Sequence, residues 1–104
     1  MKPANRASLT NGSGDVFTDL GFSPAESRSL HIRSEMMAAL GKFIEREGLT
    51  QAEAANRLRV TQPRISDLMR GKISRFSLDT LVNMLTDAGL QVELRIKPFT
   101  RHVA

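Results

Sequence analysis

The sequence predicts a mainly α-helical domain of four or five helices that ends in one β-strand. Three observations support this fold class. Apolar residues recur at helical spacing in several segments between residues 15 and 89, these segments start with capping residues and most stop at a glycine, and residues 90–97 alternate between apolar and polar. A chain of 104 residues suits a single domain.

The domain boundaries follow from composition. Residues 1–14 are rich in Ser, Asn, Gly and basic residues, which predicts a flexible N-terminal arm. Residues 15–98 form the predicted folded domain, with a C-terminal strand at 90–98. Residues 99–104 are interpreted as a tail.

The first helices are defined by their ends. Residues 15–22 predict a short turn or helix that packs onto the core. Ser23 is a plausible N-cap for the next helix, because Pro24 takes the first helical position and Glu26 lies three residues after the cap. This long helix is expected to stop at Gly48. Its apolar stripe consists of Leu30, Met37, Leu40, Phe43 and Ile44.

Two short helices are predicted at residues 51–58 and 62–70, with a turn of about three residues between them, as a helix-turn-helix requires. Thr50 and Glu53 form a capping box for the first helix. Ala54 and Ala55 are small, so the two helices can cross closely. A small internal core is expected from Leu58, Val60, Ile65 and Leu68.

A fourth helix is predicted after Ser77, which is a cap residue, and it is expected to end at Gly89. Its apolar positions are Leu78, Leu81, Val82 and Leu85. Four methionines also fall at apolar helical places and are interpreted as core residues, namely Met36, Met37, Met69 and Met84.

The stretch TQAEAANRLRVTQPRISDLMRGK resembles the helix-turn-helix of the Xre/Cro repressor superfamily. DVFTDLGFSPAE and SLDTLVNMLTDAGLQVELRIKP are similar to one branch of it, the small antitoxins and antitoxin-like regulators described as HigA-like. The resemblance covers roughly residues 15–98. It implies a lambda-repressor-like bundle that binds double-stranded DNA sequence-specifically as a transcriptional repressor, either as the antitoxin of a type II toxin–antitoxin pair or as an orphan regulator.

The resemblance also implies which residues meet DNA. Gln62 and Arg64 hold base-reading places on the second motif helix, where glutamine can pair with adenine and arginine with guanine. Asp67 could accept from a cytosine amino group, or orient Arg64 or Arg70. The base-reading set is Thr61, Gln62, Arg64, Ser66 and Asp67. The phosphate-binding set is Gln51, Arg59, Arg70, Lys72, Ser74 and Arg75.

The chain departs from the family pattern at Arg59, in the turn, where the family usually has glycine. That position often needs a positive φ, which costs a residue with a Cβ about 1 kcal/mol. A phosphate contact by Arg59 would recover part of this cost.

The alternation in residues 90–97 predicts a strand with one buried face, made of Leu90, Val92, Leu94 and Ile96. A single strand must pair with another. The simplest partner is the same strand of a second copy, giving a homodimer whose recognition helices lie about 34 Å apart, in successive major grooves. The alternative partner is a different protein, such as a toxin, bound by strand addition.

Other functions find little support. No cysteine is present, and His31 and His102 lie far apart in the sequence, so we expect no metal site and no cofactor. No Gly-rich phosphate loop or catalytic motif occurs, which argues against an enzyme. No apolar run approaches the roughly 20 residues of a membrane span, and a cytoplasmic location is expected.

The net charge of +4 permits a nucleic-acid partner without proving one. A second reading therefore stays open: a protein-interaction module that binds a toxin or another partner through its C-terminal strand and has no DNA-reading role.

Overall fold

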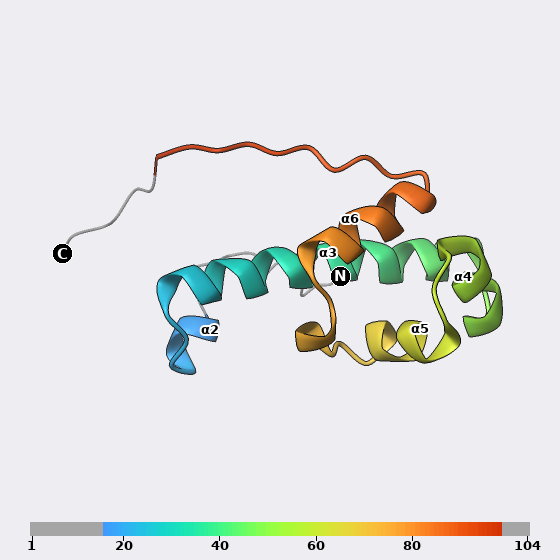
Figure 1. The fold of residues 1–104 in the computed structure, drawn as a ribbon, viewed down its shortest axis with the longest axis horizontal. Helices are drawn as coiled ribbons and strands as arrows, with labels where there is room; N and C mark the ends of the chain where they lie inside the picture. Colours follow the sequence, from blue (N-terminus) through green and yellow to red (C-terminus); the bar gives the residue numbers. More distant parts are fainter. Residues whose placement is uncertain (1–15, 99–104) are drawn as a thin grey trace.

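The computed structural model describes residues 16–98, so the predicted arm at 1–14 and tail at 99–104 lie outside the described residues. These residues form helices joined by short connections, followed by an extended segment (Figure 1). The helices are α2 (Val16–Asp19), α3 (Pro24–Glu47), α4 (Gln51–Leu58), α5 (Gln62–Met69), the 3₁₀ helix η1 (Ile73–Arg75) and α6 (Leu78–Asp87). None of them is both long and apolar enough to cross a membrane.

Helix α3 is the central element: α2, α5, η1 and α6 pack along it, and α4 packs against α5 and α6 (Figure 1). Its predicted capping box is confirmed: the Glu26 amide donates to the Ser23 hydroxyl at 3.2 Å, and the Ser23 amide donates to the Glu26 carboxylate at 3.0 Å. The helix ends where Gly48 adopts a φ of 65°. The core lies along one side of α3 and includes Met36, Met37, Leu40, Phe43 and Ile44.

Helices α4 and α5 form the predicted helix-turn-helix. The capping box at the start of α4 is present. The Glu53 amide donates to the Thr50 hydroxyl at 3.1 Å, and the Thr50 amide donates to the Glu53 carboxylate at 2.9 Å. Ala54, Leu58 and Ile65 are fully buried, and α4 and α5 pack against each other. The turn contains Arg59 at a φ of 58°, the left-handed conformation expected for this position.

Helix α6 packs against α3 and is capped by Ser77, whose hydroxyl accepts from the Thr80 amide at 3.1 Å. Leu81, Met84 and Leu85 are buried. Leu78 and Val82 are 40% and 38% exposed, so the apolar stripe on α6 is wider than the face that the single chain covers.

Residues 90–98 are extended, but no strand is formed within residues 16–98, and the predicted β-strand is not supported. The physical reason is that a strand needs a hydrogen-bonded neighbour, and no other described segment is extended in this way. Leu90 packs against the core, whereas Leu94 and Ile96 are 81% and 83% exposed. The segment runs alongside α3 without being buried by it (Figure 1).

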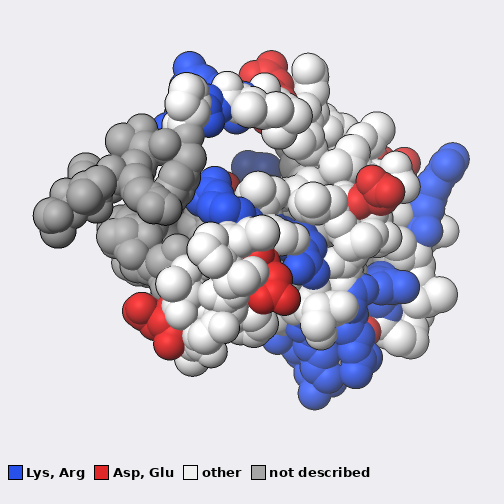
Figure 2. Space-filling view, turned by 60° about the vertical axis from the view of Figure 1, so that its left-hand side comes forward, with Lys and Arg blue, Asp and Glu red and all other residues white. Residues whose placement is uncertain are grey.

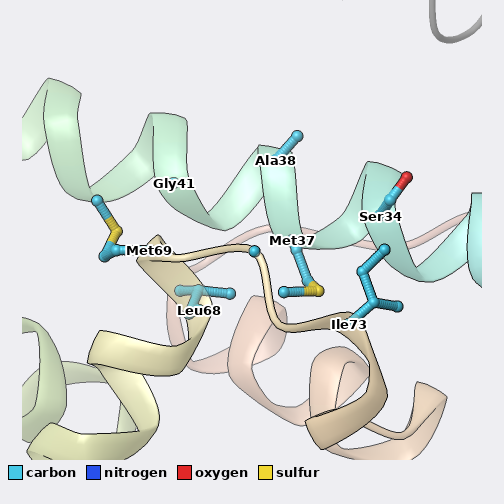
Figure 3. A pocket seen from close by; sticks show the side chains of 8 residues that line it. Ser34, Met37, Ala38, Gly41, Leu68, Met69 and Ile73 are labelled. Atoms are coloured by element: carbon cyan, nitrogen blue, oxygen red, sulfur yellow. The ribbon is translucent and has the colours of Figure 1, made fainter.

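The interpretation of Met69 as a core residue is wrong. Its side chain is 49% exposed and extends from the end of α5 toward α3 (Figure 3). There it borders an open apolar cavity of about 310 Å³, whose other walls include Met37, Leu68 and Ile73. Met36, Met37 and Met84 are buried, as predicted.

Candidate nucleic-acid interface

The N-terminal turn of α5 is an accessible part of the helix-turn-helix. Thr61, Gln62 and Pro63 are exposed, whereas Ile65 and Leu68 hold the opposite side of α5 in the core. The Thr61 hydroxyl caps the helix by accepting from the Arg64 amide at 3.4 Å. The exposed amide of Gln62 offers a donor and an acceptor to an external group, and the Thr61 hydroxyl, which accepts in the cap, can still donate its hydrogen.

Basic residues flank α5 at both ends. Arg59 lies in the turn before it, and Arg70, Lys72 and Arg75 follow it in the loop that leads through η1 to α6. In the space-filling view, Lys and Arg side chains gather along the lower edge of the molecule, the edge on which α5 and η1 lie in Figure 1 (Figure 2). Such a cluster attracts a polyanion.

Gln51 is exposed at the first position of α4, and Ser74 is exposed in η1. The predicted phosphate-binding residues thus lie on three successive connections around α5: the start of α4, the turn and the loop. These positions suit a duplex whose major groove takes the end of α5 and whose sugar-phosphate backbone is contacted on each side of that helix.

Arg64, predicted to read a base, is engaged within the protein itself. Its Nη1 donates to the carbonyl oxygen of Arg75 at 2.6 Å. Its guanidinium also lies over the ring of Phe76, with Cζ 5.3 Å from the ring centroid. The side chain is therefore partly buried and directed toward η1.

Asp67 also contacts the loop. Its Oδ2 accepts from Arg75 Nη1 at 3.2 Å, and the carboxylate is only 16% exposed. The arginine that Asp67 orients is thus Arg75, whereas the sequence suggested Arg64 or Arg70. Ser66, the remaining predicted base-reading residue, is half-buried on α5.

Arg33 on α3 belongs to the same region and was missed by the sequence analysis. Its Nη1 donates to the carbonyl oxygens of Ile73 and Phe76, at 3.3 Å and 3.1 Å, and its Nε to Ser29. No local signal could have found it, because the loop carbonyls are 40 and 43 positions away in the sequence.

The region has no features of a metal centre: among residues 16–98, no group of three or more His, Asp or Glu side chains is placed to hold an ion. What the arrangement offers is hydrogen-bond donors and positive charge around one projecting helix end. These are the groups that bind bases and phosphates.

A family model described as a helix-turn-helix domain matches residues 16–97. This match covers most of the chain, which therefore belongs to that helix-turn-helix family. The fold and the family together define the class of a DNA-binding regulator. A comparison with curated proteins finds no match.

Proposed function

We propose that this protein is a transcriptional repressor that recognises a specific double-stranded DNA sequence by inserting the N-terminal end of α5 into the major groove. The observation that carries the proposal is the exposed Gln62 on that helix end, with Arg59 before it and the loop carrying Lys72 and Arg75 after it. A glutamine amide can pair with adenine through two hydrogen bonds, and the flanking cations can bind phosphates.

The repressor acts as a homodimer in this proposal. The exposed apolar residues support it: Leu78 and Val82 lie on α6, and Leu94 and Ile96 lie on the extended segment that follows it. Pairing of this segment with its counterpart in a second copy would complete a two-stranded sheet and bury these side chains. Two recognition helices could then contact a palindromic site in successive major grooves.

A salt titration on duplex DNA from the protein's own upstream region tests the proposal. Wild type is expected to bind this duplex more tightly than a scrambled one, with steep loss of affinity as salt rises. Gln62→Ala should lower affinity for the specific duplex by roughly tenfold, the loss of one bidentate base contact, and leave binding to the scrambled duplex unchanged.

Gln91→Ala is the matched control, since it removes the same side chain from the exposed segment after α6. It should behave as wild type on both duplexes. Equal, weak binding of wild type to both duplexes would overturn the repressor proposal.

A second candidate function, binding of a toxin or other protein by the extended segment, is favoured by the exposure of Leu94 and Ile96. In this case the protein neutralises the product of a neighbouring gene. Co-expression with that product tests it: Leu94→Glu would abolish rescue of growth, and Gln62→Ala would not. Rescue by both variants would exclude this use of the segment.

A further inference from the structure

The loop that joins α5 to α6 is held by two arginines that come from different helices. Arg33 on α3 donates to the carbonyl oxygens of Ile73 and Phe76, and Arg64 on α5 donates to that of Arg75. Three backbone carbonyl oxygens in and directly after η1 thus each accept a hydrogen bond from a guanidinium, namely those of Ile73, Arg75 and Phe76.

The loop is also anchored by the buried ring of Phe76, by Ile73, which packs against the core, and by the Lys72 amide, which donates to the carbonyl oxygen of Asp67 at 3.0 Å. η1 is a single 3₁₀ turn of three residues, and no side chain caps its N-terminus. Its amides are tied only locally: Ile73 donates to Gly71, Arg75 to Lys72, and Phe76 to Ile73. Charge-assisted hydrogen bonds are about twice as strong as neutral ones, so the two guanidiniums add order to the backbone between Ile73 and Phe76 beyond that given by the apolar contacts.

We propose that Arg64 is a positioning residue, which sets the shape of the η1 loop and so places the phosphate-binding cations Lys72 and Arg75, and that it does not read a base. The inference rests on the proposed DNA-binding function. The Nη1 of Arg64 is already used by the Arg75 carbonyl, and its guanidinium lies over the ring of Phe76, so a bidentate contact with guanine would compete with this arrangement.

The pair formed by Asp67 and Arg75 completes this arrangement. Asp67 lies one turn along α5 from Arg64 and holds the guanidinium of Arg75, while Arg64 holds the backbone of the same residue. Arg75 is therefore fixed to α5 at two points. Any shift of the loop would move its charge relative to the recognition helix.

The first measurement needs no DNA. Hydrogen exchange of the amides of residues 72–76 is compared in wild type, Arg64→Met and Arg64→Lys. Methionine keeps an apolar contact with Phe76 but donates no hydrogen bond, so exchange should become faster in this loop. Lysine can still donate to the Arg75 carbonyl and should restore slow exchange.

The matched control is Arg57→Met, because Arg57 also lies over a buried ring, at 5.2 Å from the centroid of Phe43, but does not contact the loop. It should leave exchange at residues 72–76 unchanged. Circular dichroism melting confirms that every variant is folded before its exchange is compared.

The second measurement uses two duplexes, the consensus that wild type selects from a random pool and a scrambled version. Arg64→Met should weaken binding to both by the same factor, about eightfold at 0.1 M salt if one phosphate contact is lost. The order of preference among single-base variants of the consensus should stay that of wild type, and Arg64→Lys should bind within about twofold of wild type.

Loss of preference at one base pair in Arg64→Met, with unchanged loop exchange, would show that Arg64 reads a base and overturn the proposal. A uniform loss of affinity with unchanged exchange would also overturn it, because Arg64 would then bind a phosphate itself. If wild type selects no consensus, the repressor function fails instead, and loop exchange alone decides whether Arg64 positions the loop.

Discussion

Arg59 combines two tasks that usually fall to different residues. It ends α4 in the left-handed conformation, with a φ of 58°, and its exposed side chain adds positive charge at the start of α5. Glycine would adopt this backbone conformation without the Cβ penalty. Arg59 therefore lowers the stability of the fold through the cost of its Cβ in this conformation, and it places a positive charge where a DNA phosphate is expected.

Arg59→Gly should raise the free energy of unfolding by about 0.5 kcal/mol, because relief of the Cβ penalty exceeds the greater freedom of glycine in the unfolded chain. The same variant should bind DNA with a salt slope smaller by about 0.9, the value of one phosphate contact. Urea denaturation followed by circular dichroism measures the first effect, and a salt titration measures the second.

Arg46→Gly is the control for this comparison, since Arg46 lies on the exposed side of the last turn of α3. There glycine replaces arginine in helical conformation and should lower stability by about 0.5–1 kcal/mol. Destabilisation of Arg59→Gly by the same amount would contradict the assignment of a strained turn.

Residues whose partners are close in sequence could be predicted, and residues whose partners are distant could not. The caps Ser23, Thr50 and Thr61 act on amides three positions away, so a short pattern identifies them. Arg33 and Arg64 act on carbonyls that only the folded chain brings near. For Arg64, the sequence indicated the correct helix but not the direction of the side chain.

At the scale of elements, each helix of the motif depends on its own N-cap. Thr50→Ala should lower the free energy of unfolding by about 1 kcal/mol, because the Glu53 amide at the start of α4 loses its acceptor. Thermal and urea denaturation provide the measurement. Glu53→Gln keeps a side-chain acceptor for the Thr50 amide and should cost less; an equal or larger loss in Glu53→Gln would contradict this assignment of the capping energy.

The helices were predictable as elements because their periodicity, caps and stops agree over the same residues. α4 and α5 begin and end within one residue of the predicted bounds. The prediction of the C-terminal strand had a weaker basis than the predictions of the helices. Alternation predicts which side chains share a face, but hydrogen bonding to a neighbour makes a strand, and within residues 16–98 the chain supplies no neighbour for residues 90–97.

For the whole molecule, the exposed residues of α6 and of the extended segment lead to a test of the homodimer. Leu94→Glu combined with Ile96→Glu should convert a dimer into a monomer, because charges would be buried in the paired segments. Sedimentation equilibrium measures the mass. The monomer should also lose most of its affinity for a palindromic duplex, since only one recognition helix remains bound.

Arg95→Ser combined with Lys97→Ser is the control for the homodimer, since it changes the alternate positions of the same segment and should leave a dimer. A dimer of unchanged mass in Leu94→Glu/Ile96→Glu would remove the segment from the interface. Dimerisation also predicts that the melting temperature of wild type rises with protein concentration.

The extended segment has one more consequence. No backbone hydrogen bond joins residues 91–98 to another described residue, so a row of main-chain donors and acceptors is open beside exposed Leu94 and Ile96. Open edges of this kind seed fibrils. Here the charges of Glu93, Arg95 and Lys97 interrupt the apolar run, and Pro98 has no amide hydrogen to extend it. Concentrated protein is therefore expected to stop at pairs of chains, and replacing Glu93, Arg95 and Lys97 with apolar residues would turn a pairing edge into an aggregating one.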